Sequence, residues 1–175
     1  MTENIDDVDF GEIQARVHKA IKCLEENDLY LFEYDACERA IAHRFAVCLE
    51  REFPTWHVDC EYDILPPNEA GIAIDKYANL KMRRKDGKII PLEEKEAISV
   101  YPDIIVHRRG TNENLLVVEV KKSKHDDEIA FDHMKLEAYR HDDHLRYRFA
   151  LFIRFQKPQG DRSIVDTDLF HWFAE

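Results

Sequence analysis

Two short apolar runs on either side of a turn-rich segment constrain the fold of this chain more than any other feature. Residues 104–106 read Ile-Ile-Val, and residues 115–120 read Leu-Leu-Val-Val-Glu-Val. The segment Arg-Arg-Gly-Thr-Asn-Glu-Asn between them is typical of a hairpin loop. We therefore expect two antiparallel strands that pair with each other.

The second strand of this hairpin carries charged side chains on one face. Glu119 and Lys121 are two positions apart and so point to the same side, while Val118 and Val120 point to the other. A hairpin that is symmetric about Thr111 places Asp103 opposite Glu119. Two facing carboxylates repel unless a cation lies between them, and oxygen ligands suit Mg²⁺, Mn²⁺ or Ca²⁺. A cross-strand ion pair on a solvated face is the plainer interpretation of Glu119 and Lys121, but it leaves Asp103 unexplained.

The remaining elements follow from periodicity and from helix and strand ends. Apolar residues at helical spacing predict a helix over residues 11–26, ended by Asn27 and Asp28. A second helix is expected over residues 35–52, with Asp35 as its N-cap and Pro54 beyond its end. Further expected elements are a strand at 56–64, a helix at 125–141 with Ala130, Phe131, Met134 and Ala138 on one side, and strands at 147–155 and 164–173.

This element order predicts the fold class and the domain organisation. Helices precede and follow the strands in the chain, which favours an α/β fold of the mixed α+β kind, with a central mixed sheet flanked by helices. With 175 residues the chain suits one domain, residues 1–175. Residues 68–100 show no clear period and are expected to form an insertion or a long excursion.

The charged residues of the hairpin also carry a family resemblance. Pro102-Asp103, followed on the next strand by Glu119-Val120-Lys121, resembles the PD-(D/E)xK nuclease superfamily, which has a restriction-endonuclease-like core. The resemblance implies that Asp103, Glu119 and the backbone carbonyl of Val120 bind Mg²⁺ or Mn²⁺. It also implies that Lys121 is the catalytic lysine.

In this superfamily a glutamate on an early helix often completes the site, and Glu38 is the matching residue. Glu38 continues an apolar row formed by Ala42, Phe45 and Leu49, and a carboxylate that points inward needs a partner. The alternative is that Glu38 is the N3 half of a capping box with Asp35.

The net charge of −11 argues against a protein whose whole surface binds nucleic acid, so any such contact must be local. The candidate contact residues are basic ones in the expected excursion and in the hairpin turn, basic ones directly after the motif, and two residues one turn apart on the helix that follows. They are Arg83, Arg84, Lys85, Arg108, Arg109, Lys122, Lys124, Lys135 and Tyr139.

The sequence thus predicts a divalent-metal-dependent nuclease that hydrolyses phosphodiester bonds, with DNA as the favoured substrate. The alternative is a nuclease-fold protein that acts as a non-catalytic binding or assembly subunit. The sequence leaves open whether the chain forms a homodimer or binds a protein partner. An acidic N-terminus and the lack of a long apolar run predict a cytoplasmic protein without membrane contact, and four cysteines without a CxxC pair predict reduced thiols.

Overall fold

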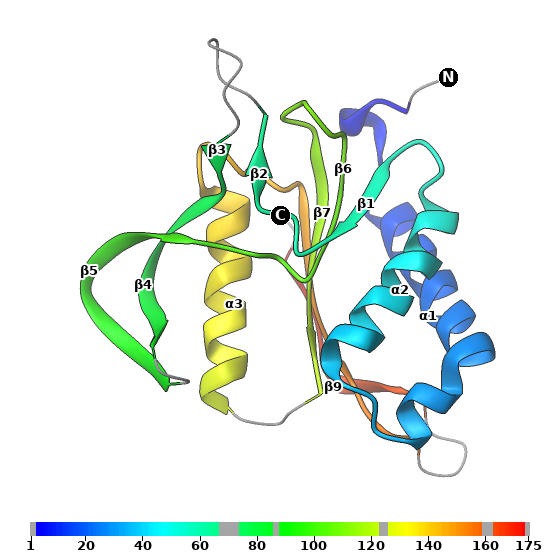
Figure 1. The fold of residues 1–175 in the computed structure, drawn as a ribbon. Coiled ribbons are helices and arrows are strands. Elements are labelled where there is room, and N and C mark those ends of the chain that lie inside the picture. Colours follow the sequence, from blue (N-terminus) through cyan, green and yellow to red (C-terminus); the bar gives the residue numbers. More distant parts are fainter. Residues whose placement is uncertain (1–2, 67–73, 86–87, 123–125, 159–162, 174–175) are drawn as a thin grey trace.

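A central sheet of five strands organises the molecule (Figure 1). The computed structural model describes residues 3–66, 74–85, 88–122, 126–158 and 163–173. The strand order is β1-β6-β7-β8-β9, and every neighbouring pair is antiparallel except β7 and β8, which are parallel. These strands are β1 (His57–Cys60), β6 (Ile104–His107), β7 (Asn114–Lys121), β8 (Phe149–Phe155) and β9 (Val165–Phe173).

Helices cover both faces of this sheet, so the predicted mixed α+β class with a flanked mixed sheet is confirmed. The helices α1 (Phe10–Glu33) and α2 (Glu38–Glu52) pack side by side on one face, while α3 (Asp126–His141) lies on the other (Figure 1). A short 3₁₀ helix, η1 (Ile5–Asp7), precedes α1. All side chains of β6, β7 and β8 are buried. The sheet therefore separates two hydrophobic cores, one beneath α1 and α2 and one beneath α3.

The hairpin of β6 and β7 has the predicted register. Ile104 pairs with Val118 and Ile105 pairs with Val117, so the positions that extend this register are Asp103 and Glu119. The register shifts only after Val106, close to the loop. In that loop Gly110 has a φ of 76°, a left-handed conformation that glycine adopts without strain.

The ends of the first two helices differ from the expectation. Asp28 has non-helical φ and ψ angles, but α1 continues to Glu33, so the helix kinks there instead of ending. The prediction that α2 starts with Asp35 as its N-cap is wrong. The helix begins at Glu38 with Cys37 as its N-cap and no side-chain cap, because Asp35 has a φ of 56°. Glu38 therefore has no capping box with Asp35.

The predicted strand at 56–64 is broken in two. Pairing with β6 ends at Cys60, and the next residue, Glu61, has a φ of 48°. The chain then enters β2 (Ile64–Leu65), which pairs with β3 (Ile74–Asp75) outside the main sheet. The alternation of apolar and polar residues runs on to Ile64, past Glu61, where the backbone turns.

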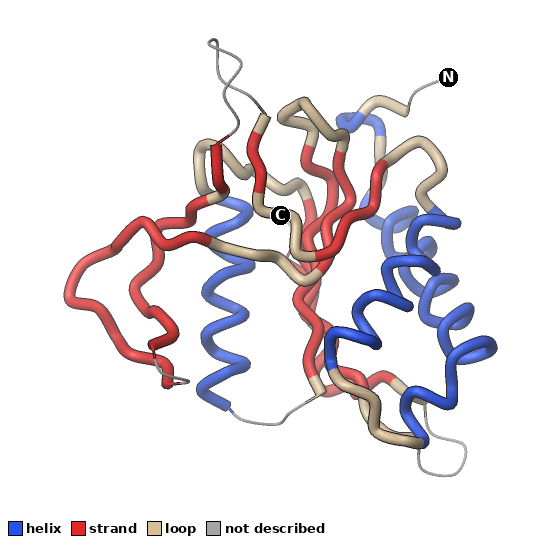
Figure 2. Tube along the Cα trace, viewed as in Figure 1, coloured by secondary structure: helices blue, strands red, loops and turns tan. Residues whose placement is uncertain are grey.

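Part of the expected excursion at 68–100 is regular structure. The antiparallel strands β4 (Tyr77–Lys85) and β5 (Lys88–Ser99) form a separate ribbon over α3 (Figure 2). Ala78, Leu80 and Val100 are buried in the core beneath α3, so this segment helps to cover the helix. Residues 68–73 and 86–87 of the expected excursion lie outside the described residues.

The described part of the chain contains no helix that is both long and apolar enough to cross a membrane. All four cysteines are free thiols, and Cys48 donates a hydrogen bond to the sulfur of Cys23 across the α1–α2 contact.

Candidate active site

The register of the hairpin places charged groups at one end of the sheet, where β7 ends and where α2 and α3 begin (Figure 1). Val118 and Val120 belong to the core beneath α1 and α2, so Glu119 and Lys121 point to the α3 side. Glu119 is fully buried and Lys121 is 8% exposed, which excludes a solvated ion pair as the explanation of this face. Asp103 lies beside them and accepts a hydrogen bond from the backbone N–H of Val120 at 2.8 Å.

The helix α3 contributes two further charged residues. The Lys135 Nζ atom lies 2.7 Å from Glu119 Oε2 and 2.8 Å from Asp132 Oδ1. The other Asp132 oxygen, Oδ2, lies 3.1 Å from Lys121 Nζ. Asp132 thus connects the lysine of the predicted motif to a lysine on α3, one helical turn further along.

Glu38 joins the same group from α2. Its Oε1 lies 3.2 Å from Lys121 Nζ, and its Oε2 accepts a hydrogen bond from the backbone N–H of Lys122 at 2.9 Å. As predicted, the row of Ala42, Phe45 and Leu49 below it is buried. We call Glu38, Asp103, Glu119, Lys121, Asp132 and Lys135 the carboxylate cluster.

Negative charge is in excess in this cluster, because four carboxylates face two ammonium groups. Burial raises the pKa of Glu119 well above its usual range, and the Asp103 charge adds to this effect. Burial likewise raises the pKa of Asp103. Burial acts to lower the pKa of Lys135, but Glu119 and Asp132 outweigh it and raise that pKa. The pKa of Lys121 is raised in the same way, by Asp132 and Glu38.

Three buried polar atoms at this place have no hydrogen-bond partner within the described residues, namely Glu119 Oε1, the Tyr139 hydroxyl and Asp132 Oδ2, the last of which has only its ion-pair contact with Lys121. A buried polar atom without a partner is costly and usually indicates a functional role or an unrepresented water or ion. The Tyr139 pKa is raised well above its usual value by burial and by the nearby Glu119. An acceptor oxygen in an environment with excess negative charge is suited to a cation.

The residues fit a hard divalent cation by this charge and ligand type. Among the described residues, no three His, Cys, Asp or Glu side chains form a metal-binding group. Mg²⁺ sites, however, commonly use one or two carboxylates and complete the shell with water and substrate phosphate oxygens. Asp103 and Glu119 match that pattern.

Asp132 was missing from the sequence prediction, and Lys135 was assigned only to nucleic-acid binding. The buried residues of α3 are Ile129, Asp132, Leu136 and Tyr139. Of the residues predicted to lie on one side, Phe131, Met134 and Ala138 pack partly buried against the core beneath α3, and only Ala130 is exposed. An acid in a buried helical row is the same signal that identified Glu38. The predicted side counted only apolar residues, so an acid within the buried row was passed over.

The basic residues of the β4–β5 ribbon are exposed or half-buried and take part in surface ion pairs. Arg83 lies 3.7 Å from Glu96, and Arg84 lies 2.9 Å from Glu128. Lys85 is exposed at the end of β4. These three residues stay candidates for nucleic-acid contact.

The other candidates for nucleic-acid contact differ in how accessible they are. Arg108 stacks over the Trp56 ring, and Arg109 pairs with Asp59. Lys122 pairs with Asp35 at 2.6 Å, and Lys124 lies outside the described residues. Tyr139 is fully buried, so the expectation that it contacts nucleic acid at the surface is wrong.

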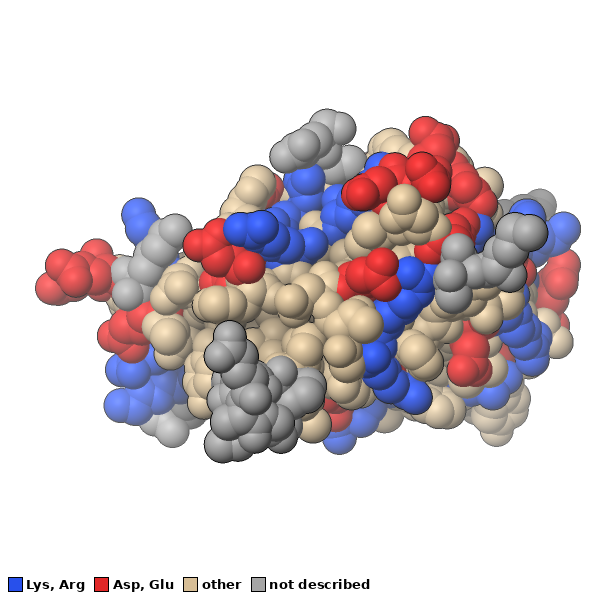
Figure 3. All heavy atoms as spheres, turned by 90° about the horizontal axis from the view of Figure 1, so that it is seen from above, with Lys and Arg blue, Asp and Glu red and all other residues tan. Residues whose placement is uncertain are grey.

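Positive charge is dispersed on the face of the molecule that Figure 3 shows. In the face seen in Figure 3, groups of Lys and Arg alternate with groups of Asp and Glu and form no continuous basic area. This face therefore offers no extended basic area to a polyanion, in keeping with the net charge of −11.

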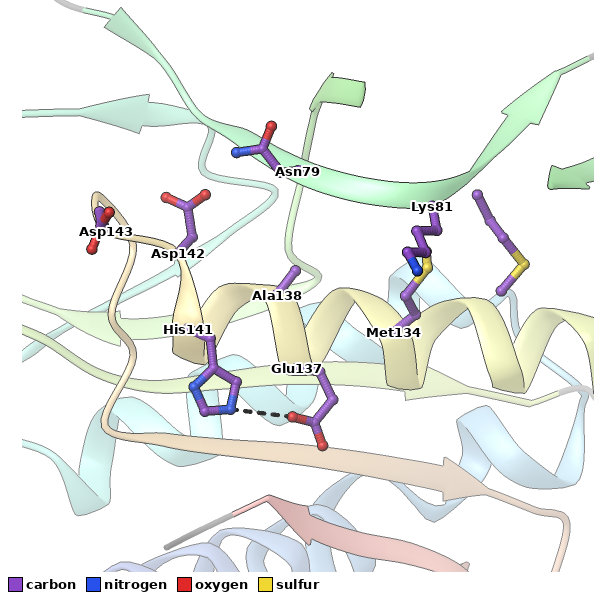
Figure 4. Close-up of a pocket in the computed structure, with 9 residues that line it drawn as sticks. Asn79, Lys81, Met134, Glu137, Ala138, His141, Asp142 and Asp143 are labelled. Atoms are coloured by element: carbon purple, nitrogen blue, oxygen red, sulfur yellow. Dashed lines mark ion pairs between the residues drawn. The ribbon is translucent and has the colours of Figure 1, made fainter. Parts of the chain in front are cut away.

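Two hollows of similar size lie near α3 and α2. A groove of about 540 Å³ between β4 and α3 is lined by Asn79, Lys81, Glu137 and His141 among others, and includes no member of the carboxylate cluster (Figure 4). A pocket of about 550 Å³ beside α2 is lined by Glu38 and Asp103, together with Cys37, Arg39, Ala42, His43, Cys60 and Glu61. The carboxylate cluster therefore meets the surface at the second hollow, which we call the α2 pocket.

Comparisons with known proteins provide no name for this arrangement. No family model and no curated protein matches the chain. A solved structure described as "Crystal structure of SSO0001" aligns over 92% of this chain and 75% of that one, with 14% identity and a TM-score of 0.27. A likeness at that TM-score carries no argument, so the function has to be inferred from the site.

Proposed function

We propose that this protein is a divalent-metal-dependent nuclease that hydrolyses phosphodiester bonds, with DNA as its substrate. The observation that carries the proposal is the buried excess of negative charge around Glu119, one of whose oxygen atoms has no hydrogen-bond partner among the residues that the structure describes. This arrangement opens on a pocket through Glu38 and Asp103. The match of Asp103, Glu119 and Lys121 to the PD-(D/E)xK pattern supports the choice of reaction.

The ligands in this proposal are Asp103, Glu119 and the Val120 carbonyl, with Glu38 as a further carboxylate, and Mg²⁺ or Mn²⁺ as the cofactor. Bound there, the ion would polarise a phosphoryl oxygen and lower the pKa of its water. Asp103 is held in position by the Val120 N–H, and Glu119 by Lys135.

We assign to Lys121 the stabilisation of the negative charge that develops on the phosphate during the reaction. Its pKa is raised by Asp132 and Glu38, which keeps the amine protonated despite burial. A fixed positive charge in a buried site stabilises an oxyanion more strongly than it would in water. Glu38 and Asp132 each pair with this ammonium group. Asp132 thereby acts as a positioning residue, while Glu38 positions the lysine in addition to its place among the proposed ligands.

The test is cleavage of plasmid DNA, single-stranded DNA and RNA by the purified chain in Mg²⁺, in Mn²⁺ and in EDTA. We expect metal-dependent cleavage that is lost in Asp103→Asn. Asp59→Asn, which alters a partly buried aspartate in a different cluster, is the matched control and should retain cleavage. Absence of cleavage of all three substrates by the wild type would contradict the proposal.

A binding or assembly subunit is the second candidate, and one observation favours it. Lys135 and Lys121 already pair directly with Glu119 and Asp132, so part of the buried charge is compensated internally. The acidic net charge also suits a protein partner better than bare nucleic acid. Under this candidate, metal ions should neither bind nor shift the unfolding temperature, which calorimetry and thermal melts would measure.

A further inference from the structure

Arg39, on the wall of the α2 pocket, forms an exposed ion pair with Glu61. The Arg39 side chain is 81% exposed, and its Nε donates a hydrogen bond to Glu61 Oε1 at 2.8 Å. Both residues line the pocket that Glu38 and Asp103 also line. A guanidinium group therefore stands at the wall of the hollow where the carboxylate cluster reaches the surface.

The ion pair of Arg39 with Glu61 is of a kind that another anion can replace. Glu61 is 51% exposed, so water screens the attraction between the two side chains. Nε is the only Arg39 nitrogen with a hydrogen bond among the described residues. Glu61 is held by this single hydrogen bond, whereas a phosphate group can accept two parallel hydrogen bonds from the same guanidinium.

The backbone fixes where Glu61 stands relative to the cluster. Glu61 follows β1 with a φ of 48°, and its N–H donates to the carbonyl of Asp103 at 3.3 Å. Arg39 follows Glu38 directly on α2. Arg39 is thus next to Glu38 in the chain, and Glu61 is joined to Asp103 by a backbone hydrogen bond. Both members of the ion pair are adjacent to a carboxylate of the cluster.

We propose that Arg39 binds a backbone phosphate of the nucleic acid next to the scissile one, and that Glu61 occupies Arg39 until this phosphate displaces it. The inference rests on the proposed function for its substrate class. His43, one helical turn after Arg39 on the pocket wall, would lie beside the same strand of the bound nucleic acid. Glu61 then lowers the affinity for nucleic acid without touching it.

The test measures the affinity for a labelled single-stranded oligonucleotide and for a labelled duplex by fluorescence anisotropy, in EDTA and in Ca²⁺, at several salt concentrations. Arg39→Gln should weaken binding roughly tenfold, since a charge-assisted hydrogen bond is lost. The slope of log K against log salt should fall by about 0.9 for duplex and about 0.7 for single strands. Glu61→Gln should tighten binding roughly two- to fivefold, because the competing pair is gone.

The double variant separates competition for Arg39 from a general effect of charge. In the Arg39→Gln background, Glu61→Gln should have no effect on affinity. Equal tightening by Glu61→Gln in both backgrounds would overturn the inference. Glu50→Gln removes the same charge from an exposed position of α2 and is the matched control. Thermal melts check that each variant is folded.

The outcomes also distinguish this inference from the nuclease proposal. Cleavage by the wild type with unchanged affinity in Arg39→Gln would overturn the phosphate site and leave the nuclease intact. The expected affinity changes without any cleavage would support the phosphate site and reject the nuclease. A wild type that binds neither DNA nor RNA would overturn both.

Discussion

Two clusters of buried charge lie on this small fold, and they are compensated differently. In the carboxylate cluster, four acids face two lysines, and burial raises the pKa of both Asp103 and Glu119. In the second cluster, Asp59 alone accepts from Arg109 and from His107 at 2.8 Å each. Burial acts to raise the pKa of Asp59, but these two partners outweigh it and lower that pKa.

The difference separates a structural ion pair from a candidate site. A carboxylate whose pKa is lowered has its charge satisfied by the fold and contributes to stability. A buried carboxylate whose pKa is raised has more negative charge around it than the protein compensates, which is common in functional sites. Substitutions of the same type in both clusters should therefore have different consequences.

The largest expected difference concerns one buried lysine in each cluster. Lys121→Met should reduce metal-dependent cleavage by on the order of 10² to 10³, because it removes a fixed charge near the reacting phosphate. Lys76 is a buried lysine whose charge interacts with that of Asp59, so it belongs to the second cluster. Lys76→Met should leave the rate within about threefold, since no catalytic charge is lost. Initial cleavage rates of folded preparations check both. Robust cleavage by Lys121→Met would remove Lys121 from its assigned role.

The second difference is that Lys76 makes the stability of the folded protein depend on pH. Lys76 is 2% exposed and donates to the Tyr147 hydroxyl at 2.8 Å, and burial lowers its pKa from 10.5 to about 8. Between pH 8 and 10.5 the unfolded chain therefore binds more protons at this lysine than the folded chain does. Stability should rise with pH across this window, by up to roughly 3 kcal/mol. Below pH 8 the destabilising effect of the buried charge is fully present.

Urea unfolding at a series of pH values measures this contribution as the difference between the wild type and Lys76→Met. The difference isolates Lys76 from the tyrosines and cysteines that also titrate at high pH. A difference that is constant from pH 7.5 to about 10.5 would show that the amine is solvated in the folded state.

The third difference is the stability of Asp59→Asn. This change leaves Arg109 and His107 with a neutral acceptor, so the charge-assisted hydrogen bonds are weakened. The Arg109 side chain is 53% exposed, and water can partly replace its partner. The expected loss is about 1–2 kcal/mol, measured by urea unfolding at pH 7. An unchanged stability would mean that Asp59 is not satisfied by these partners.

The smallest effect on stability is expected for Glu119→Gln. This change should leave the stability unchanged or raise it slightly, whereas Asp59→Asn should lower it. Glutamine still accepts a hydrogen bond from Lys135, while one of the excess negative charges disappears. Unfolding in EDTA should show a stability that is unchanged or higher by less than ~1 kcal/mol. A loss above ~2 kcal/mol would show that the protein does compensate Glu119 and that the contrast between the clusters is unfounded.

Several parts of the candidate site could be predicted because they depend on short-range regularities. Side-chain alternation places Glu119 and Lys121 on one face, and the short loop defines the register that brings Asp103 opposite Glu119. The helical row that contains Glu38 is likewise a property of one segment. Where the backbone departs from a regular pattern the prediction failed, as at Asp35 and Glu61, since a left-handed residue there leaves little trace in the pattern of apolar residues.

The sequence by itself determined which side chains share a face and which neighbouring strands pair, because these depend on backbone geometry over a few residues. Only the tertiary structure decided that β7 and β8 run parallel, that the β4–β5 ribbon covers α3, and that Asp132 and Lys135 meet Glu119. These relations join segments far apart in the chain. The contacts of Asp132 and Lys135 with Glu119, for example, depend on how α3 is rotated when its buried row packs on the sheet. That rotation is set by the fit of whole surfaces and not by any single segment.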